Sequence, residues 1–222
     1  MRKDIDHQAA LCREVGGSVD GRLLAAFVNP APGERLAELG VGCGEVTFLV
    51  AQSAVDGWVD GLELQPELVE VARYRLASLP FGHRVRVWQG DVRSPPKEML
   101  AGGYDRVFSN PPFFKKGSGR LPPDRRRAMA RFEQAGTLAD FIGCGAVLLR
   151  QEGVFCLIHR PERLDEILAT LRQFGLSPTR LLPVCDQPGG PEVLVLIAAK
   201  KGGSASLEKE PPWIITQWEA QP

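Results

Sequence analysis

From Arg35 onward, short runs of apolar residues alternate with longer stretches in which apolar residues recur every three to four positions. The short runs are rich in β-branched and aromatic residues and predict strands, whereas the longer stretches predict amphipathic helices. The predicted strands cover residues 35–41, 58–64, 85–91, 104–109 and 154–159. This alternation is typical of βαβ units and predicts a parallel sheet with helices on both faces.

The clearest helix signal follows Pro66, a suitable first-turn residue, where Leu68, Ala72, Leu76 and Leu79 are spaced by three or four residues. Further helices are predicted over residues 46–51, 138–150 and 162–174, and before the first strand from Ser18 or Asp20 to about Pro30. We expect these helices to cover the sheet.

Two more apolar runs, residues 181–185 and 193–199, lie near the C-terminus. They are joined through the sequence Pro-Gly-Gly-Pro at positions 188–191, a composition that favours a tight turn. The pattern predicts an antiparallel pair of strands at the edge of the sheet. Together with the five preceding strands, it predicts a mostly parallel, seven-stranded α/β sheet.

Composition narrows the class of protein. A chain of 222 residues suits one domain, and equal numbers of basic and acidic residues, 27 of each, give no overall basic field of the kind typical of nucleic-acid binding.

The five cysteines include no Cys-x-x-Cys pair and predict reduced thiols in a cytoplasmic protein. Without a signal peptide or a run of ~18 apolar residues, we expect a protein that is neither exported nor membrane-spanning. No spacing of His, Cys, Asp or Glu predicts a metal site.

A glycine-rich loop follows the first predicted strand, where residues 38–44 read Glu-Leu-Gly-Val-Gly-Cys-Gly and an apolar helix comes next. Such loops let a ligand approach the backbone and the free N–H groups of the helix. The dinucleotide fingerprint G-x-G-x-x-G fails, because Glu45 or Thr47 occupies the third glycine position. The negative charge of Glu38 would repel a pyrophosphate but attract the ammonium and sulfonium groups of S-adenosylmethionine. The predicted cofactor-binding residues in this loop are Glu38, Gly40, Gly42 and Gly44.

Two further acids end predicted strands on the same edge of the sheet. Glu63 lies 19 residues after Gly44, close to the spacing at which an acid binds ribose hydroxyls in doubly wound folds. Asp91 ends the third strand and can accept a hydrogen bond from the amino group of the cofactor's adenine. Leu64 and Val92, which follow these acids, complete the predicted pocket.

The sequence Asn110-Pro111-Pro112-Phe113 ends the fourth strand and predicts the chemistry. An exocyclic amino group on an aromatic ring is a poor nucleophile, because its lone pair is delocalised. The side-chain carbonyl of Asn110 and the backbone carbonyl of Pro111 can accept its two protons, on a backbone that the prolines stiffen. Phe113 can stack on the base, and Asn110 also borders the cofactor pocket. These residues predict an enzyme that methylates an amino group, largely by positioning that group against the methyl donor.

The glycine loop and the Asn-Pro-Pro-Phe sequence resemble those of the class I adenine-N6 methyltransferases. Segments 17–27, 127–133 and 159–164 further resemble the bacterial family that methylates adenine N6 beside the anticodon of valine tRNA, and the likeness covers roughly residues 15–215. It implies a Rossmann-like class I fold, with S-adenosylmethionine held by Glu38, Gly40, Glu63 and Asp91 and adenine held by Asn110, Pro111 and Phe113.

The pattern of elements divides the chain into an N-terminal helical segment with a lid at 1–34, a methyltransferase domain at 35–202 and a C-terminal tail at 203–222. The chain departs from the family at Val15-Gly16-Gly17, where aromatic and basic residues are usual, and at Glu38, where Asp is more frequent. Because of the first departure, we expect the lid over the RNA or the cofactor to differ from that of the family.

A basic run follows the Asn-Pro-Pro-Phe sequence and predicts contacts with RNA phosphates. It consists of Lys115, Lys116, Arg120, Arg125, Arg126, Arg127 and Arg131. The run favours tRNA as the partner over a protein glutamine. Methylation of glutamine N5 uses the same Asn-Pro-Pro sequence to bind an amide. Adenine in rRNA or DNA and a non-catalytic RNA-binding module stay open as alternatives, and we expect a monomer or homodimer.

Overall fold

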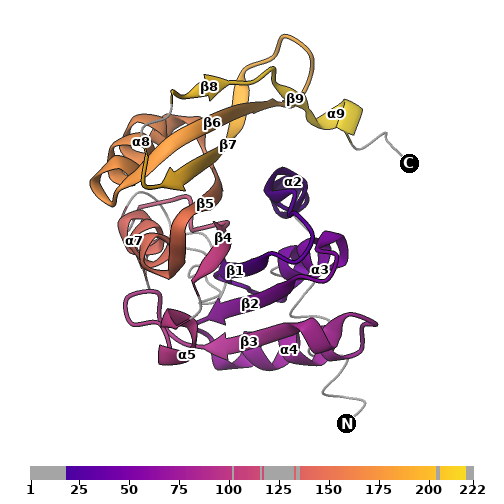
Figure 1. The fold of residues 1–222 in the computed structure, drawn as a ribbon. Coiled ribbons are helices and arrows are strands. Elements are labelled where there is room, and N and C mark those ends of the chain that lie inside the picture. Colours follow the sequence, from indigo (N-terminus) through magenta and orange to yellow (C-terminus); the bar gives the residue numbers. More distant parts are fainter. Residues whose placement is uncertain are drawn as a thin grey trace.

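The structure is a computed structural model that describes residues 19–101, 103–115, 117, 133, 136–203 and 206–218. Within these residues, nine strands form one sheet in the order β3-β2-β1-β4-β5-β7-β6-β8, and β9 also pairs with β6 (Figure 1). The strands are β1 (Arg35–Leu39), β2 (Trp58–Glu63), β3 (Val85–Gln89), β4 (Tyr104–Ser109), β5 (Leu149–His159), β6 (Leu176–Cys185), β7 (Glu192–Lys201), β8 (Glu208–Lys209) and β9 (Trp213–Ile214).

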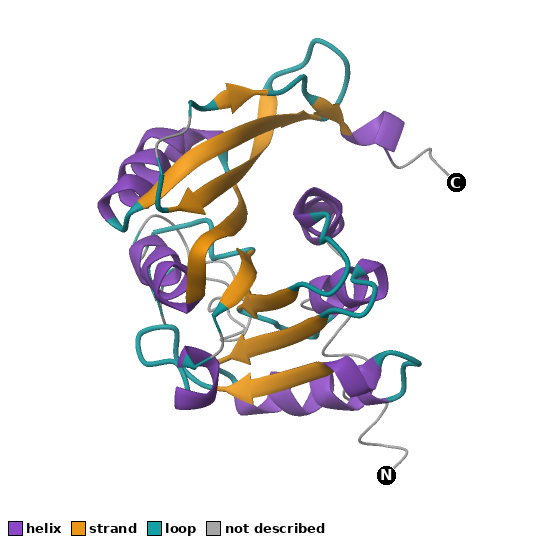
Figure 2. Ribbon diagram, viewed as in Figure 1, coloured by secondary structure: helices purple, strands orange, loops and turns teal. Residues whose placement is uncertain are grey.

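Helices cover both faces of the sheet (Figure 2). The described helices are α2 (Val19–Val28), α3 (Glu45–Ser53), α4 (Pro66–Ala77), α5 (Lys97–Leu100), α7 (Leu138–Leu148), α8 (Leu164–Gln173), α9 (Ile215–Trp218) and the short 3-10 turns η1 (Gly82–Arg84) and η2 (Pro161–Arg163). One apolar core lies between the sheet and α7 and α8, and another lies between the opposite face and α2 and α3. The predicted α/β architecture is therefore confirmed.

Neighbouring strands β1 to β5 run parallel, and β7 pairs antiparallel with both β5 and β6. The predicted hairpin is thus present, with β7 inside the sheet and β6 further out. Strand β5 begins at Leu149, where the helix was predicted to continue to Arg150, because the extended backbone of Leu149 ends α7.

The segment predicted as a tail pairs with the outer strand of the hairpin. β8 lies parallel to β6 at Arg180 and Leu181, and β9 lies parallel to it at Val184 and Cys185. Trp213 packs against the core on the α2 side. These short pairings cover an edge that would otherwise expose unpaired backbone groups. None of the described helices combines the length and apolar character needed to cross a membrane.

Candidate active site

The carboxyl ends of the parallel strands lie at one edge of the sheet. Leu39 is in register with Leu62 on one side and Ser109 on the other, and Glu63 is in register with Gln89. The Ser109 hydroxyl donates to the Leu39 carbonyl at 2.8 Å and joins the end of β4 to that of β1. The loops that carry the predicted cofactor residues and the Asn-Pro-Pro-Phe sequence therefore start side by side, as is usual for ligand sites in such sheets.

The glycine loop turns tightly between β1 and α3. Gly40, Gly42 and Gly44 have φ values of 82°, 56° and 83°, in the left-handed region that favours glycine. The Gly40 N–H donates to the Leu62 carbonyl at 2.8 Å, and Gly44 is the N-cap residue of α3. No heavy atom lies within 4 Å of where a Gly42 Cβ would stand, so this part of the loop is open to a ligand.

Cys43, in the same loop, is buried against Leu68 and Val71 of α4. Its carbonyl accepts a hydrogen bond from Arg75 at 2.8 Å. These contacts favour a packing role over thiol chemistry.

Glu63 holds the glycine loop from the neighbouring strand. Its carboxylate accepts from the Gly42 N–H at 2.9 Å through one oxygen and from the Gln65 N–H at 2.9 Å through the other. The side chain is almost fully buried, and this burial raises its pKa. A carboxylate fixed beside the loop in this way suits the predicted contact with ribose hydroxyls.

Glu38 belongs to β1, and its side chain contacts the first turn of α3, with 1% of its surface exposed. The Thr47 hydroxyl donates to its Oε2. Burial, partly offset by Thr47 and reinforced by the nearby charge of Glu63, raises the pKa of Glu38 to about 8. The carboxyl predicted to complement a cationic cofactor is therefore mostly protonated at neutral pH unless a positive charge lies beside it.

We expect Glu38→Gln to remove a pH dependence of stability. The folded-state pKa of Glu38 is above its ordinary value of 4.5, so its favourable contribution is complete below pH 4.5 and is lost as pH rises toward about 8. The amide resembles the protonated acid, and the variant should gain about 3 kcal/mol relative to wild type between pH 5 and pH 8. Urea unfolding of both proteins at these two pH values measures this; parallel pH profiles would contradict it.

Asp91 and its neighbours lie just after β3. The Asp91 carboxylate accepts from the backbone N–H of Arg93 at 2.9 Å and from its guanidinium at 2.5 Å, and these hydrogen bonds lower its pKa. Val92 and Leu64 are half-buried, and Val92 packs against the core beside α7. The amino group of the cofactor's adenine would donate to the same carboxylate that accepts the hydrogen bonds of Arg93.

The Asn-Pro-Pro-Phe loop leaves β4 toward the turn that follows β5. Pro111 is buried, and Asn110, Pro112 and Phe113 are half-buried. The ring of Phe113 packs on that of His159, with centroids 5.0 Å apart and planes at 52°. The aromatic face predicted to stack on a base therefore has a fixed support behind it.

His159 is fully buried at the end of β5. Its Nδ1 accepts from the Arg160 N–H at 2.8 Å, which assigns the proton of the neutral ring to Nε2. Burial, followed by the charge of Arg163, lowers the pKa of His159 to about 4, so the ring is neutral at physiological pH. Its contact with Phe113 suits a structural role, in which the neutral ring supports the Asn-Pro-Pro-Phe loop.

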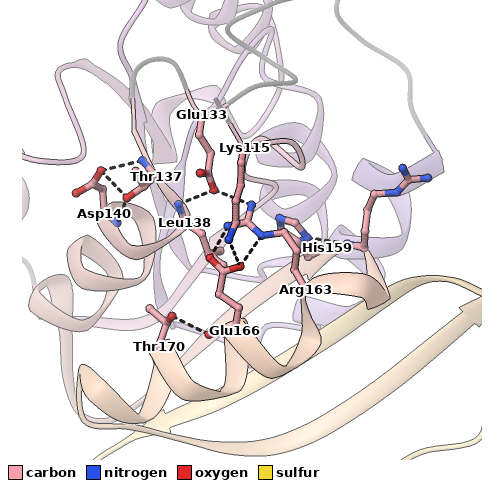
Figure 3. Close-up of polar contacts among 10 residues, drawn as sticks. Lys115, Glu133, Thr137, Leu138, Asp140, His159, Arg163, Glu166 and Thr170 are labelled. Atoms are coloured by element: carbon pink, nitrogen blue, oxygen red, sulfur yellow. Dashed lines mark hydrogen bonds and ion pairs between the residues drawn. The ribbon is translucent and has the colours of Figure 1, made fainter. Parts of the chain in front are cut away.

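The turn after β5 carries further residues whose role was not predicted. The Arg160 guanidinium lies 5.4 Å from the Phe114 ring centroid, and Arg163 binds Glu133 and Glu166 (Figure 3). One indirect signal was present, the family-like segment 159–164, but nothing in that segment assigned partners to these arginines.

Of the basic run, Lys115 belongs to the described residues and forms an ion pair with Glu166 at 2.9 Å. The other predicted RNA contacts, Lys116, Arg120, Arg125, Arg126, Arg127 and Arg131, lie outside the described residues. Among the described residues there is no group of three or more potential metal ligands. The described cysteines are free and buried, and burial raises the pKa of the Cys156 thiol to about 11.

The sheet order, the antiparallel β7 and the loops at the carboxyl edge define a class I, Rossmann-like methyltransferase. A predicted O-methyltransferase from Agrobacterium tumefaciens has a similar structure, with a TM-score of 0.71 and 26% identity over 88% of this chain and 87% of that one. A putative RNA methyltransferase from Pyrococcus horikoshii aligns with a TM-score of 0.59 and 21% identity over 82% and 83% of the two chains.

The methyltransferase small domain family matches residues 17–124. A tRNA1(Val) (adenine(37)-N6)-methyltransferase from Porphyromonas gingivalis is 31% identical over 98% of this chain and 78% of its own length, and one from Yersinia enterocolitica is 29% identical over 86% and 75%. The chain belongs to the tRNA1(Val) (adenine(37)-N6)-methyltransferase family. The family expected from the sequence is thereby confirmed.

Proposed function

We propose that this chain transfers the methyl group of S-adenosylmethionine to the exocyclic N6 of adenine 37 in tRNA1(Val). Its relatives carry this activity in their names, and the site has the parts that the reaction needs. The observation that carries the proposal is that the Asn110–Phe113 loop begins beside the glycine loop, since Ser109 and Leu39 are paired in register.

The described residues fit the cofactor. The left-handed turn at Gly40, Gly42 and Gly44 leaves the backbone at Gly42 open to the methionine part, and Glu63 would bind the ribose hydroxyls. Asp91 and Val92 would border the adenine. When bound, S-adenosylmethionine supplies an electrophilic methyl group on a sulfonium. A positive charge near Glu38 would favour its ionised form and offset part of the cost of burying this carboxylate.

The catalytic loop acts by positioning and by accepting hydrogen bonds. The Asn110 side-chain carbonyl and the Pro111 carbonyl accept the two N6 protons, which localises the nitrogen lone pair toward the methyl carbon. Phe113, supported by His159, stacks on the adenine and holds N6 in line. The nitrogen becomes acidic once the new bond forms, so no strong general base is needed.

The substrate follows from the family and from the basic run. A flipped, single-stranded anticodon-loop adenine presents its N6 edge to such a pocket. Protein-glutamine N5 methylation uses a similar loop, but the basic run and the relatives favour tRNA. A tRNA-modifying role also fits a cytoplasmic location.

Methyl transfer to purified tRNA1(Val) tests this function. The protein, labelled S-adenosylmethionine and unmodified tRNA1(Val) should yield N6-methyladenosine at position 37, detected by nucleoside analysis and mapping. A transcript with guanine at position 37 is the matched control and should accept no label. Label found on protein glutamine, or on another RNA position, would overturn the assignment.

We expect joint neutralisation of Arg125, Arg126 and Arg127 to weaken tRNA binding and flatten its salt dependence. Three lost phosphate contacts should reduce the slope of log Kd against log salt by about 2 to 3. Fluorescence anisotropy over a salt series measures the slope. Neutralising three exposed basic residues elsewhere, Arg150, Arg172 and Lys209, is the control. An unchanged slope in the first variant would remove these arginines from the interface.

A further inference from the structure

The turn after β5 lies beside the Asn-Pro-Pro-Phe loop, and successive residues of the two segments meet in pairs. The ring of His159 contacts that of Phe113, with centroids 5.0 Å apart, and the guanidinium of Arg160 lies 5.4 Å from the ring centroid of Phe114. This match arises because β4 and β5 are parallel neighbours that end at the same edge of the sheet. Arg160 is therefore held beside the residue that follows the predicted base-stacking side chain.

The guanidinium of Arg160 has hydrogen-bond donors available. The side chain is half-buried, and the guanidinium forms no hydrogen bond or ion pair with another residue that the structure describes. Arg163, three residues later, instead binds the carboxylates of Glu133 and Glu166. The contact with Phe114 fixes where the Arg160 guanidinium lies without using its N–H groups, because a cation–π contact involves the face of the ring.

The charge of Arg160 is only partly compensated by its neighbours. Burial raises the pKa of Asp20, in the first turn of α2, and the charge of Arg160 opposes this rise. The two side chains, both among the described residues, nevertheless form no direct ion pair. Glu166, in the first turn of α8, is bound by Arg163 and Lys115. One positive charge beside the loop is thus left to attract an anion.

The order of the strands separates Arg160 from the residues expected to hold the cofactor. Those residues lie at the ends of β1, β2 and β3, whereas β4 lies between β1 and β5, whose end precedes Arg160. An anion at Arg160 would therefore lie across the Asn-Pro-Pro-Phe loop from the glycine loop. The anion that arrives there with a stacked adenine is a phosphate of the RNA backbone, because each base is joined to its phosphates through its ribose.

We propose that Arg160 binds the RNA phosphate next to the adenine that is methylated. This inference rests on the proposed function and deepens it. The guanidinium, stacked on Phe114, would donate two parallel hydrogen bonds to the phosphate oxygens, while Phe113 stacks on the base of the same nucleotide. Because His159 supports Phe113 and Phe114 supports Arg160, base and backbone would be held in a fixed relation to Asn110.

Arg160→Met tests this contact beside the matched control Arg172→Met, which removes an exposed arginine on α8. We expect Arg160→Met to raise the Kd and the KM for tRNA1(Val) about tenfold and to lower the slope of log Kd against log salt by about 1, because one phosphate contact is lost. The Kd for S-adenosylmethionine should not change, and Arg172→Met should match wild type in every measurement. Fluorescence anisotropy, steady-state kinetics and calorimetric titration measure these quantities.

A neutral phosphate analogue locates the contact. Full-length tRNA1(Val), ligated from synthetic pieces, would carry a methylphosphonate on the 5′ or the 3′ side of adenine 37, or in the acceptor stem as the control. One of the two flanking methylphosphonates should weaken binding to wild type about tenfold and to Arg160→Met hardly at all, since that contact is already missing. The acceptor-stem analogue should affect both proteins equally.

Arg160→Lys provides a second variant in case Arg160→Met folds poorly. It keeps the positive charge but lacks the planar fork, so we expect the wild-type salt slope with an intermediate KM for tRNA1(Val). Equal Tm values for this variant and wild type would exclude a loss of folding as the cause of the raised KM.

Three results would overturn the inference. They are a wild-type Kd and salt slope in folded Arg160→Met, an equal effect of each methylphosphonate on both proteins, and a loss confined to S-adenosylmethionine binding, which would assign Arg160 to the cofactor's carboxylate. If the wild-type protein binds tRNA1(Val) but does not methylate adenine 37, the proposed function fails instead, and the Kd and salt slope still decide whether Arg160 binds a phosphate.

Discussion

Replacing Asn110 with alanine should lower kcat about a hundredfold to a thousandfold, the range found when one preorganised hydrogen-bonding group is removed from an active site. The side-chain carbonyl acts on the accepting nitrogen as charge develops there, so its loss reduces stabilisation of the transition state. The cofactor should still bind with nearly unchanged affinity, because Gly42 and Glu63 remain in place. Single-turnover kinetics with saturating tRNA and calorimetric titration of S-adenosylmethionine measure the two quantities.

Asn110→Gln is the matched control. It retains the carbonyl but displaces it by one methylene group, and it should also be slow if catalysis depends on position. Equal Tm values for the variants and wild type would exclude a loss of folding. A large loss of cofactor affinity in Asn110→Ala, with turnover preserved at saturation, would contradict the assigned division between catalysis and cofactor binding.

Glu63→Ala should weaken S-adenosylmethionine binding about a hundredfold, equivalent to about 2.7 kcal/mol. The change removes the proposed acceptor for the ribose hydroxyls and also the acceptor that holds the N–H of Gly42. The half-buried Gln65 also loses the acceptor of its N–H, so the loop itself becomes less well defined. Calorimetry or equilibrium dialysis with the cofactor measures the loss.

Glu67→Ala, at an exposed acid in the first turn of α4, controls for the loss of one negative charge nearby. It should bind the cofactor like wild type. Cofactor affinity in Glu63→Ala within a factor of two of wild type would remove Glu63 from the cofactor site and leave it a purely structural role in the loop.

The local pattern of the sequence predicted where the strands and the loops between them lie. Apolar runs marked the core strands, and β4 has the predicted bounds. Gly40 and Gly44 marked a turn, because a left-handed backbone strongly favours glycine. Parallel strands end at one edge of their sheet. The positions of Glu63, Asp91 and Asn110 at the ends of predicted strands were therefore enough to place all three at that edge.

Ionisation and long-range pairing were decided by the tertiary structure. Glu38 reads in the sequence as a charged acid beside a loop, but burial raises its pKa to about 8 despite the hydrogen bond that Thr47 donates. The pairing of Arg163 with Glu133 joins residues thirty positions apart, across a stretch whose periodicity predicts no contact between them. Sequence spacing fixes local backbone geometry, whereas desolvation and ion pairing depend on which side chains the fold brings together, and only the folded chain decides that.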